Sequence, residues 1–212
     1  MEKLKNKKVI IAIVAFVIII IIMLLIGVLI KNDDSDELAQ KETVKHDVVD
    51  TLYENIMADE CTTLGNVNNE NDAIVYMAFS VMKNDKLLND SINIESYNKA
   101  IKTVAGDKDV TFNEFVYGGY KYTLSGDKIT REKSESCDTK YVSKLFGYSY
   151  SDDKLLVDVK FGYVKDDKVY NLASEEIGDY NEDTLNDVLD KGTSKTFVYD
   201  KSNKSYYLNG VK

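Results

Sequence analysis

Residues 155–164, LLVDVKFGYV, decide the fold class because apolar and polar positions alternate along them. Successive side chains of a β-strand point to opposite faces of its sheet, so a period of two indicates a strand with one buried face. Asp158 and Lys160 fall on the polar face. The apolar face consists of Leu155, Val157, Val159, Phe161 and Tyr163.

The same period of two continues on both sides of this strand. The turn sequences SGDK, SDDK and KDDK separate short alternating runs, and residues 194–212 resemble a final hairpin. In the run KLFGYSY, alternation places Phe146, Tyr148 and Tyr150 on one face. An antiparallel meander is therefore predicted from Val110 to the end of the chain.

Three helices are predicted before the meander. Apolar residues at steps of three and four indicate helices over residues 44–59 and 94–104. Asn93 is expected to cap the latter helix, and Gly106 to end it. Residues 73–82 are apolar on nearly all sides, which fits a buried helix or a buried strand; a helix is favoured because Asn71 or Asp72 can cap its start.

The apolar face of an antiparallel sheet needs cover, and the helices supply it. The sequence therefore predicts a single α+β domain over residues 42–212, with about three helices packed on a bent antiparallel meander. This architecture broadly resembles cystatin-like or NTF2-like folds. The resemblance is one of arrangement alone: neither family's motifs occur, so it implies no functional residues.

An apolar run of 22 residues without a charge, residues 9–30, precedes this domain. As a helix it would be about 33 Å long, enough to span a bilayer core. The run is too long for a typical signal-peptide core, and an uncleaved signal anchor is predicted, with cleavage as the alternative. Lysines in residues 1–8 favour a cytoplasmic tail, so the linker 31–41 and the domain are expected to face outward.

The charge distribution limits the classes of partner. The chain has a net charge of −9; residues 1–8 hold four Lys and one Glu, or +3, which leaves −12 for the remainder. So acidic a domain argues against nucleic acid and anionic headgroups as ligands. The chain has no Pro, no Trp and one Arg, a composition typical of AT-rich genomes such as those of low-GC Gram-positive bacteria.

Residues 106–115, GDKDVTFNEF, resemble the second half of a calcium-binding EF-hand loop. With Glu114 as the twelfth ligand, the loop would begin at Thr103 and have Ala105 at its third position, where carboxylates or amides are needed. Lys108 would occupy the sixth position, where Gly makes the turn. No metal site is therefore predicted here.

No catalytic or cofactor-binding residue is predicted. His46 is the only histidine, so neither a nucleophile–His pair nor a zinc site has a second histidine to use. The pairs Asp152-Asp153 and Asp166-Asp167 fall in predicted turns, where Asp is favoured for structural reasons. The chain has 15 tyrosines, which are expected to lie mostly in the strand core; an exposed row of them would suit a sugar or a peptide.

A disulfide between Cys61 and Cys137 is predicted. The chain has two cysteines, and both lie on the outward side of the predicted span, where disulfides persist. Both are also expected in connecting segments, where a bridge distorts neither a helix nor a ladder.

The sequence favours a non-enzymatic binding or scaffolding domain of the bacterial cell envelope, anchored in the membrane through residues 9–30. Its partner would be an envelope protein or a polysaccharide. Two alternatives remain open: a wall-polymer hydrolase that uses carboxylates, and an accessory subunit of a membrane complex.

Overall fold

The computed structural model describes residues 46–59, 61–134, 139–151 and 153–212. Contacts divide the chain into two units, Met1–Val48 and Val49–Lys212, and the architecture below is that of the second unit. The predicted tail 1–8, span 9–30 and linker 31–41 lie outside the described residues, and the domain start at residue 42 stays a prediction. No helix in the described ranges is long and apolar enough to cross a bilayer.

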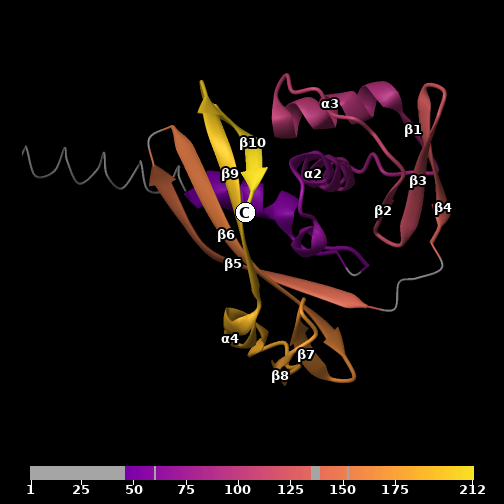
Figure 1. Cartoon of the computed structure of the whole chain (residues 1–212). Helices are drawn as coiled ribbons and strands as arrows, with labels where there is room; N and C mark the ends of the chain where they lie inside the picture. The colour runs from indigo at the N-terminus through magenta and orange to yellow at the C-terminus, as the bar shows by residue number, and fades with distance from the viewer. Residues whose placement is uncertain (1–45, 60, 135–138, 152) are drawn as a thin grey trace, which may run out of the picture. The chain divides into compact units, whose positions relative to one another are not determined.

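The unit is α+β, as predicted, but its strands form two antiparallel sheets instead of one meander (Figure 1). The small sheet has the order β1-β4-β3-β2. The large sheet has the order β10-β9-β6-β7-β8, and β5 pairs with β6. The small sheet contains β1 (Ser91–Asn93), β2 (Phe115–Tyr117), β3 (Tyr120–Ser125) and β4 (Lys128–Lys133). The large sheet contains β5 (Lys140–Ser151), β6 (Lys154–Lys165), β7 (Lys168–Asn171), β8 (Glu176–Asp179), β9 (Thr193–Ser202) and β10 (Ser205–Val211).

Four α-helices lie within the described ranges: residues 46–56, α2 (Glu70–Asn84), α3 (Ile94–Ala105) and α4 (Leu185–Val188). The 3₁₀ turns η1 (Leu64–Asn66) and η2 (Leu189–Lys191) accompany them. The predicted ends of α3 are confirmed, because Asn93 accepts a hydrogen bond from Glu95 N and Gly106 is the C-cap, with φ +65°. The cap of α2 was wrongly placed: Asn69 occupies it and accepts from Asp72 N at 2.8 Å.

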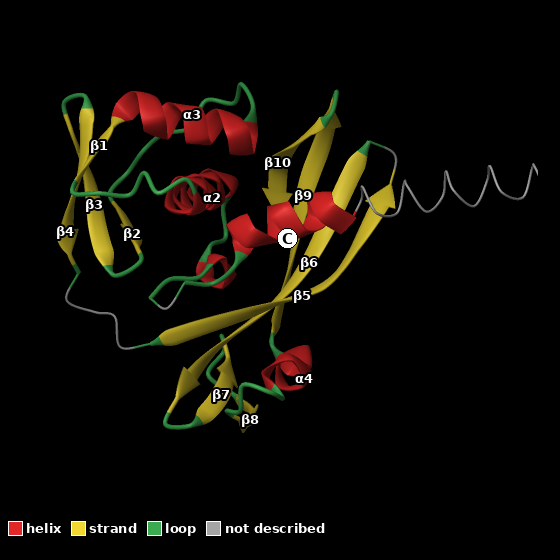
Figure 2. Ribbon diagram, turned by 180° about the vertical axis from the view of Figure 1, so that it is seen from behind, coloured by secondary structure: helices red, strands yellow, loops and turns green. Residues whose placement is uncertain are grey.

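Helix α2 lies between the two sheets (Figure 2). Towards the small sheet, the Phe79 ring lies 4.5 Å from the Tyr122 ring and 5.8 Å from the Tyr117 ring, centroid to centroid. Towards the large sheet, Tyr199 Oη donates to Met77 Sδ at 3.6 Å. Because α2 is covered by a sheet on both sides, its sequence has almost no polar face. Helices that are apolar all round are buried helices.

A β-bulge in β5 changes which of its side chains share a face of the large sheet. Leu145 pairs with Val159 and Tyr148 with Val157, so Phe146 and Gly147 together oppose Asp158. The extra residue breaks the alternation. The prediction that Phe146 shares a face with Tyr148 and Tyr150 is therefore wrong, and the Phe146 side chain is 55% exposed.

Candidate functional site

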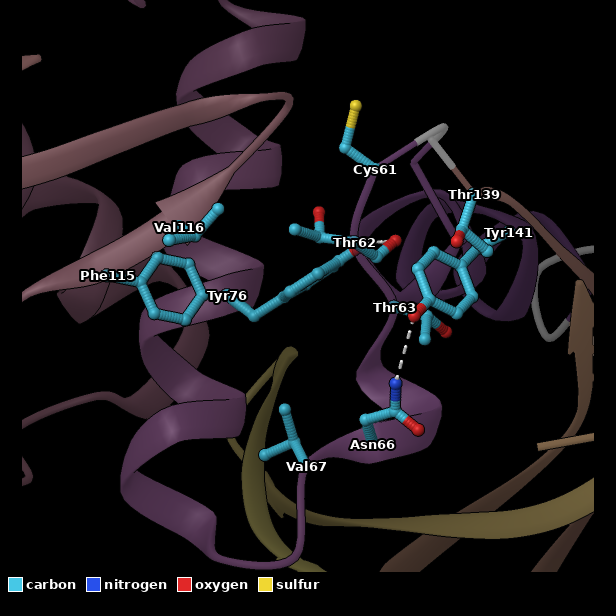
Figure 3. A pocket seen from close by; sticks show the side chains of 10 residues that line it. All are labelled: Cys61, Thr62, Thr63, Asn66, Val67, Tyr76, Phe115, Val116, Thr139 and Tyr141. Carbon is cyan, nitrogen blue, oxygen red and sulfur yellow. Dashed lines mark hydrogen bonds between the residues drawn. The ribbon is translucent and has the colours of Figure 1, made fainter. Parts of the chain in front are cut away.

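A hollow of about 560 Å³ lies beside η1, between residues of α2 and β2 and the start of β5 (Figure 3). Its volume is within the range of about 300–1,000 Å³ typical of small-molecule sites. It is lined by Cys61, Thr62, Thr63, Asn66, Val67, Tyr76, Phe115, Val116, Thr139 and Tyr141.

The two walls of the hollow are aromatic. Tyr76 and Phe115 form one wall, with ring centroids 6.3 Å apart and planes at 89°. Tyr141 forms the other wall, and Figure 3 shows it across the hollow from this pair. Tyr76 Oη donates to the carbonyls of Met57 at 3.0 Å and Thr62 at 3.3 Å. Burial raises the pKa of Tyr76, so its hydroxyl stays a protonated donor.

The floor of the hollow is a tightly held turn. Thr63 Oγ1 accepts from Gly65 N at 3.1 Å and so caps η1. Gly65 lies against β6, because a Cβ there would stand 2.9 Å from Phe161 Cβ and 2.3 Å from Leu172 Cδ1. Lys195 of β9 donates to the carbonyl of Val67. These contacts fix the position of Asn66 at the floor.

A second hollow of about 330 Å³ adjoins the first, and Asn66, Thr139 and Tyr141 line both. Its other lining residues are Tyr163, Lys165, Leu172 and Ser174. The two hollows together are called the Tyr141 groove below. At their junction, Asn66 Nδ2 donates to Tyr141 Oη at 3.5 Å.

The strand register builds a row of three tyrosines, of which Tyr141 and Tyr163 line the Tyr141 groove. Tyr141 of β5 pairs with Tyr163 of β6, which pairs in turn with Tyr170 of β7. The centroids of the first two rings are 6.3 Å apart, and those of the last two are 5.3 Å apart. All three side chains are only partly buried. Sequence reasoning assigned Tyr163 to the core and missed the row, because the row depends on register across three strands.

Another hollow, of about 520 Å³, contains charged side chains that are already paired. Lys83 Nζ lies 2.6 Å from Asp59 Oδ2, and the Asp59 side chain is only 11% exposed. Arg131 Nε lies 3.1 Å from Asp90 Oδ1, and its guanidinium stands 4.2 Å from the Tyr120 ring centroid. Burial raises the pKa of the lining Tyr117 to about 12. The charged side chains Asp59, Lys83 and Arg131 of this hollow are therefore already engaged within the protein.

The segment GDKDVTFNEF forms a connection between α3 and β2. Lys108, where an EF-hand needs Gly, donates to Glu70, to the carbonyl of Leu208 and to Asn209 Oδ1. Glu114 pairs with Lys121 at 2.8 Å. Among the described residues, no three His, Cys, Asp or Glu side chains are grouped to hold a metal ion.

The other described residues that the sequence singled out lie outside the Tyr141 groove. His46 is exposed at the start of the described chain. Asp166 and Asp167 form the β6–β7 turn with φ of 50° and 56°. Asp152 is outside the described residues. Of the described carboxylates in these pairs, Asp153, Asp166 and Asp167 do not line the Tyr141 groove.

Of the two cysteines, Cys61 lies at the rim of the Tyr141 groove (Figure 3). Cys137 falls outside the described residues, so the disulfide between them stays a prediction.

No protein-family model, curated protein or solved structure matches this chain. The function has to be argued from the groove itself.

Proposed function

We propose that the chain is a membrane-anchored domain that faces outward in the bacterial cell envelope and binds an envelope protein or polysaccharide. Residues 9–30 would be the anchor and residues 1–8 the cytoplasmic tail. The observation that carries the binding role is the Tyr141 groove, which combines aromatic walls with an uncharged polar floor. Pockets that bind ligands typically have an apolar lining with a few placed polar groups.

The groove supports binding over hydrolysis. A glycosidase of the usual kind needs two carboxyl groups flanking the scissile bond. The described lining of the Tyr141 groove contains no Asp or Glu. Asp59 lines the neighbouring hollow, but Lys83 holds it at 2.6 Å. The wall-polymer hydrolase is therefore the weaker candidate.

One observation favours an accessory subunit as a second candidate. Within the described part of the chain, β5 pairs with β6 alone, and Phe146 on β5 is largely exposed. An unpaired strand edge can accept a strand from another protein.

The proposed orientation is tested by protease treatment of intact, wall-stripped cells. We expect the domain after residue 30 to be digested, because it would stand outside the membrane. An epitope at the C-terminus should disappear from immunoblots while a cytoplasmic marker survives. Recovery of the full-length chain from sealed cells, with digestion only after lysis, would contradict the orientation.

The binding role is tested by co-sedimentation of the full chain, in detergent micelles, with isolated cell walls of a low-GC Gram-positive bacterium. We expect saturable sedimentation, weakened about fivefold to tenfold by Tyr141→Ala, because loss of one aromatic contact costs about that much. Tyr148→Ala is the matched control, since Tyr148 is an exposed tyrosine on the same strand but outside the groove. Equal sedimentation of wild type and Tyr141→Ala would exclude the groove as the binding site.

A further inference from the structure

We infer that the ligand of the Tyr141 groove is a glycan that bears a carboxylate, with one sugar ring on Tyr141 and the carboxylate at Lys165. This inference rests on the binding function proposed above. It goes further because it chooses a polysaccharide over a protein and assigns a chemical class to it.

The first support is the pairing of aromatic rings with uncharged polar groups. A sugar ring has apolar C–H faces and a rim of hydroxyls, so it needs a flat aromatic surface beside groups that both donate and accept hydrogen bonds. Tyr141 lines both halves of the groove, and Asn66 stands at their junction. The Asn66 amide makes only a 3.5 Å contact with Tyr141 Oη, which leaves most of its hydrogen-bonding capacity for a ligand.

The second support is that the floor has its backbone groups occupied. Gly65 N donates to Thr63 Oγ1, Val67 N donates to the carbonyl of Leu64, and the Val67 carbonyl accepts from Lys195. An extended peptide is recognised largely through main-chain hydrogen bonds. The η1 turn therefore offers a ligand side chains and few free main-chain groups, which favours a glycan over a peptide at the floor; the unpaired edge of β5 would be the place for a peptide strand.

The third support is the charge of the groove. Lys165 lines its far half and forms no ion pair with any described residue. Lys168, on the next strand, is held instead by Asp179 at 2.5 Å and Glu176 at 3.1 Å. The net charge of −9 opposes anion binding at long range, but the described lining of the groove has one unpaired lysine and no carboxylate, so its local charge favours a negative group.

The test uses the full chain in a detergent without a sugar headgroup and measures dissociation constants by calorimetry. The probes are a hyaluronan hexasaccharide, which carries carboxylates, chitohexaose, which has acetamido sugars without carboxylates, and pentaglutamate. We expect the hyaluronan hexasaccharide to bind about twofold to fivefold more tightly than chitohexaose, because an exposed ion pair contributes that much. Pentaglutamate should not saturate.

Variants separate the two contacts. Lys165→Gln should remove the preference for hyaluronan and leave chitohexaose binding unchanged, whereas Tyr141→Ala should weaken both sugars. Tyr141→Phe keeps the aromatic ring. If Tyr141→Ala binds weakly because the aromatic surface is missing, Tyr141→Phe should bind both sugars as the wild type does. Lys204→Gln, the same charge change in the exposed β9–β10 turn, is the control and should change neither constant.

The outcomes distinguish the inference from the function on which it rests. If the chain sediments with cell walls but neither sugar saturates, the glycan class is wrong and the binding function stands. If pentaglutamate binds as tightly as the hyaluronan hexasaccharide, charge alone drives binding and the inference fails. If walls and sugars both fail to bind, the proposed function falls as well.

Discussion

Phe79→Ala is expected to lower the free energy of unfolding by about 3–5 kcal/mol, the usual loss for a buried Phe. Phe79 is 0% exposed in α2 and lies beside five aromatic rings. Those rings belong to Tyr97, Phe112, Phe115, Tyr117 and Tyr122, with centroids 4.5–6.3 Å from that of Phe79. Removing the ring leaves a cavity that rigid neighbours fill poorly. Urea unfolding followed by tyrosine circular dichroism measures the change, since the chain has no Trp.

Tyr97→Phe is the matched control within the same cluster. Tyr97 Oη is buried without a hydrogen-bond partner, so replacing it with hydrogen removes an unsatisfied group and keeps the ring. We expect this variant to be as stable as the wild type or slightly more stable. A decrease of less than about 1.5 kcal/mol in the free energy of unfolding of Phe79→Ala would be well under the usual range. It would mean that the two sheets close over the space left by the ring, and that they do not hold α2 in a fixed position between them.

If the predicted Cys61–Cys137 disulfide forms, its loss is expected to lower the free energy of unfolding by up to about 4.5 kcal/mol. That is the chain-entropy estimate for residues 76 positions apart, numbers 61 and 137 in the sequence. It is a large part of the roughly 5–15 kcal/mol that stabilises an ordinary domain. Urea unfolding of Cys61→Ser against wild type measures it.

The stability of the cysteine variants and a thiol count give two independent checks on the bridge. Cys61→Ser, Cys137→Ser and the double variant should be equally stable, because each removes the same bond. A reductant should destabilise the wild type to that level and leave the double variant unchanged. Two thiols reacting with maleimide in the denatured, unreduced wild type would show that no bridge exists.

Helix α3 shows what local sequence can determine. Its start and end were both predictable, because the Asn93 cap and Gly106 with positive φ act within one turn of the backbone they satisfy. Helix α2 was harder. Its cover comes from both sheets, so its apolar residues follow no single helical face, and only its length and polar start favoured a helix over a strand.

The two sheets show that a period-two pattern predicts strands but not which strands pair with one another. The pattern identified β6 and its neighbours as strands, because alternation acts within each strand. It gave no sign that β4 and β5 belong to different sheets, since partner choice depends on contacts distant in sequence. The bulge at Phe146 reversed the faces after it, and its residues are ordinary strand residues.

The candidate site could be predicted least. Tyrosine abundance was visible, but Tyr141, Tyr163 and Tyr170 form a row only through the pairings of three strands. The unpaired state of Lys165 is likewise a property of the folded surface. The single histidine was readable from the sequence, because a residue count needs no knowledge of the fold.

The position of α2 between two sheets has a consequence for the order of events during synthesis. The side of α2 that packs on the small sheet finds Tyr117 and Tyr122 within a few dozen residues of chain. Its other side contacts Tyr199, which is separated from Met77 by 122 positions. Until that last hairpin leaves the ribosome, one apolar side of the helix stays uncovered in the nascent chain. Chaperones that bind the growing chain therefore meet an apolar side of α2 that is covered only once β9 has been synthesised.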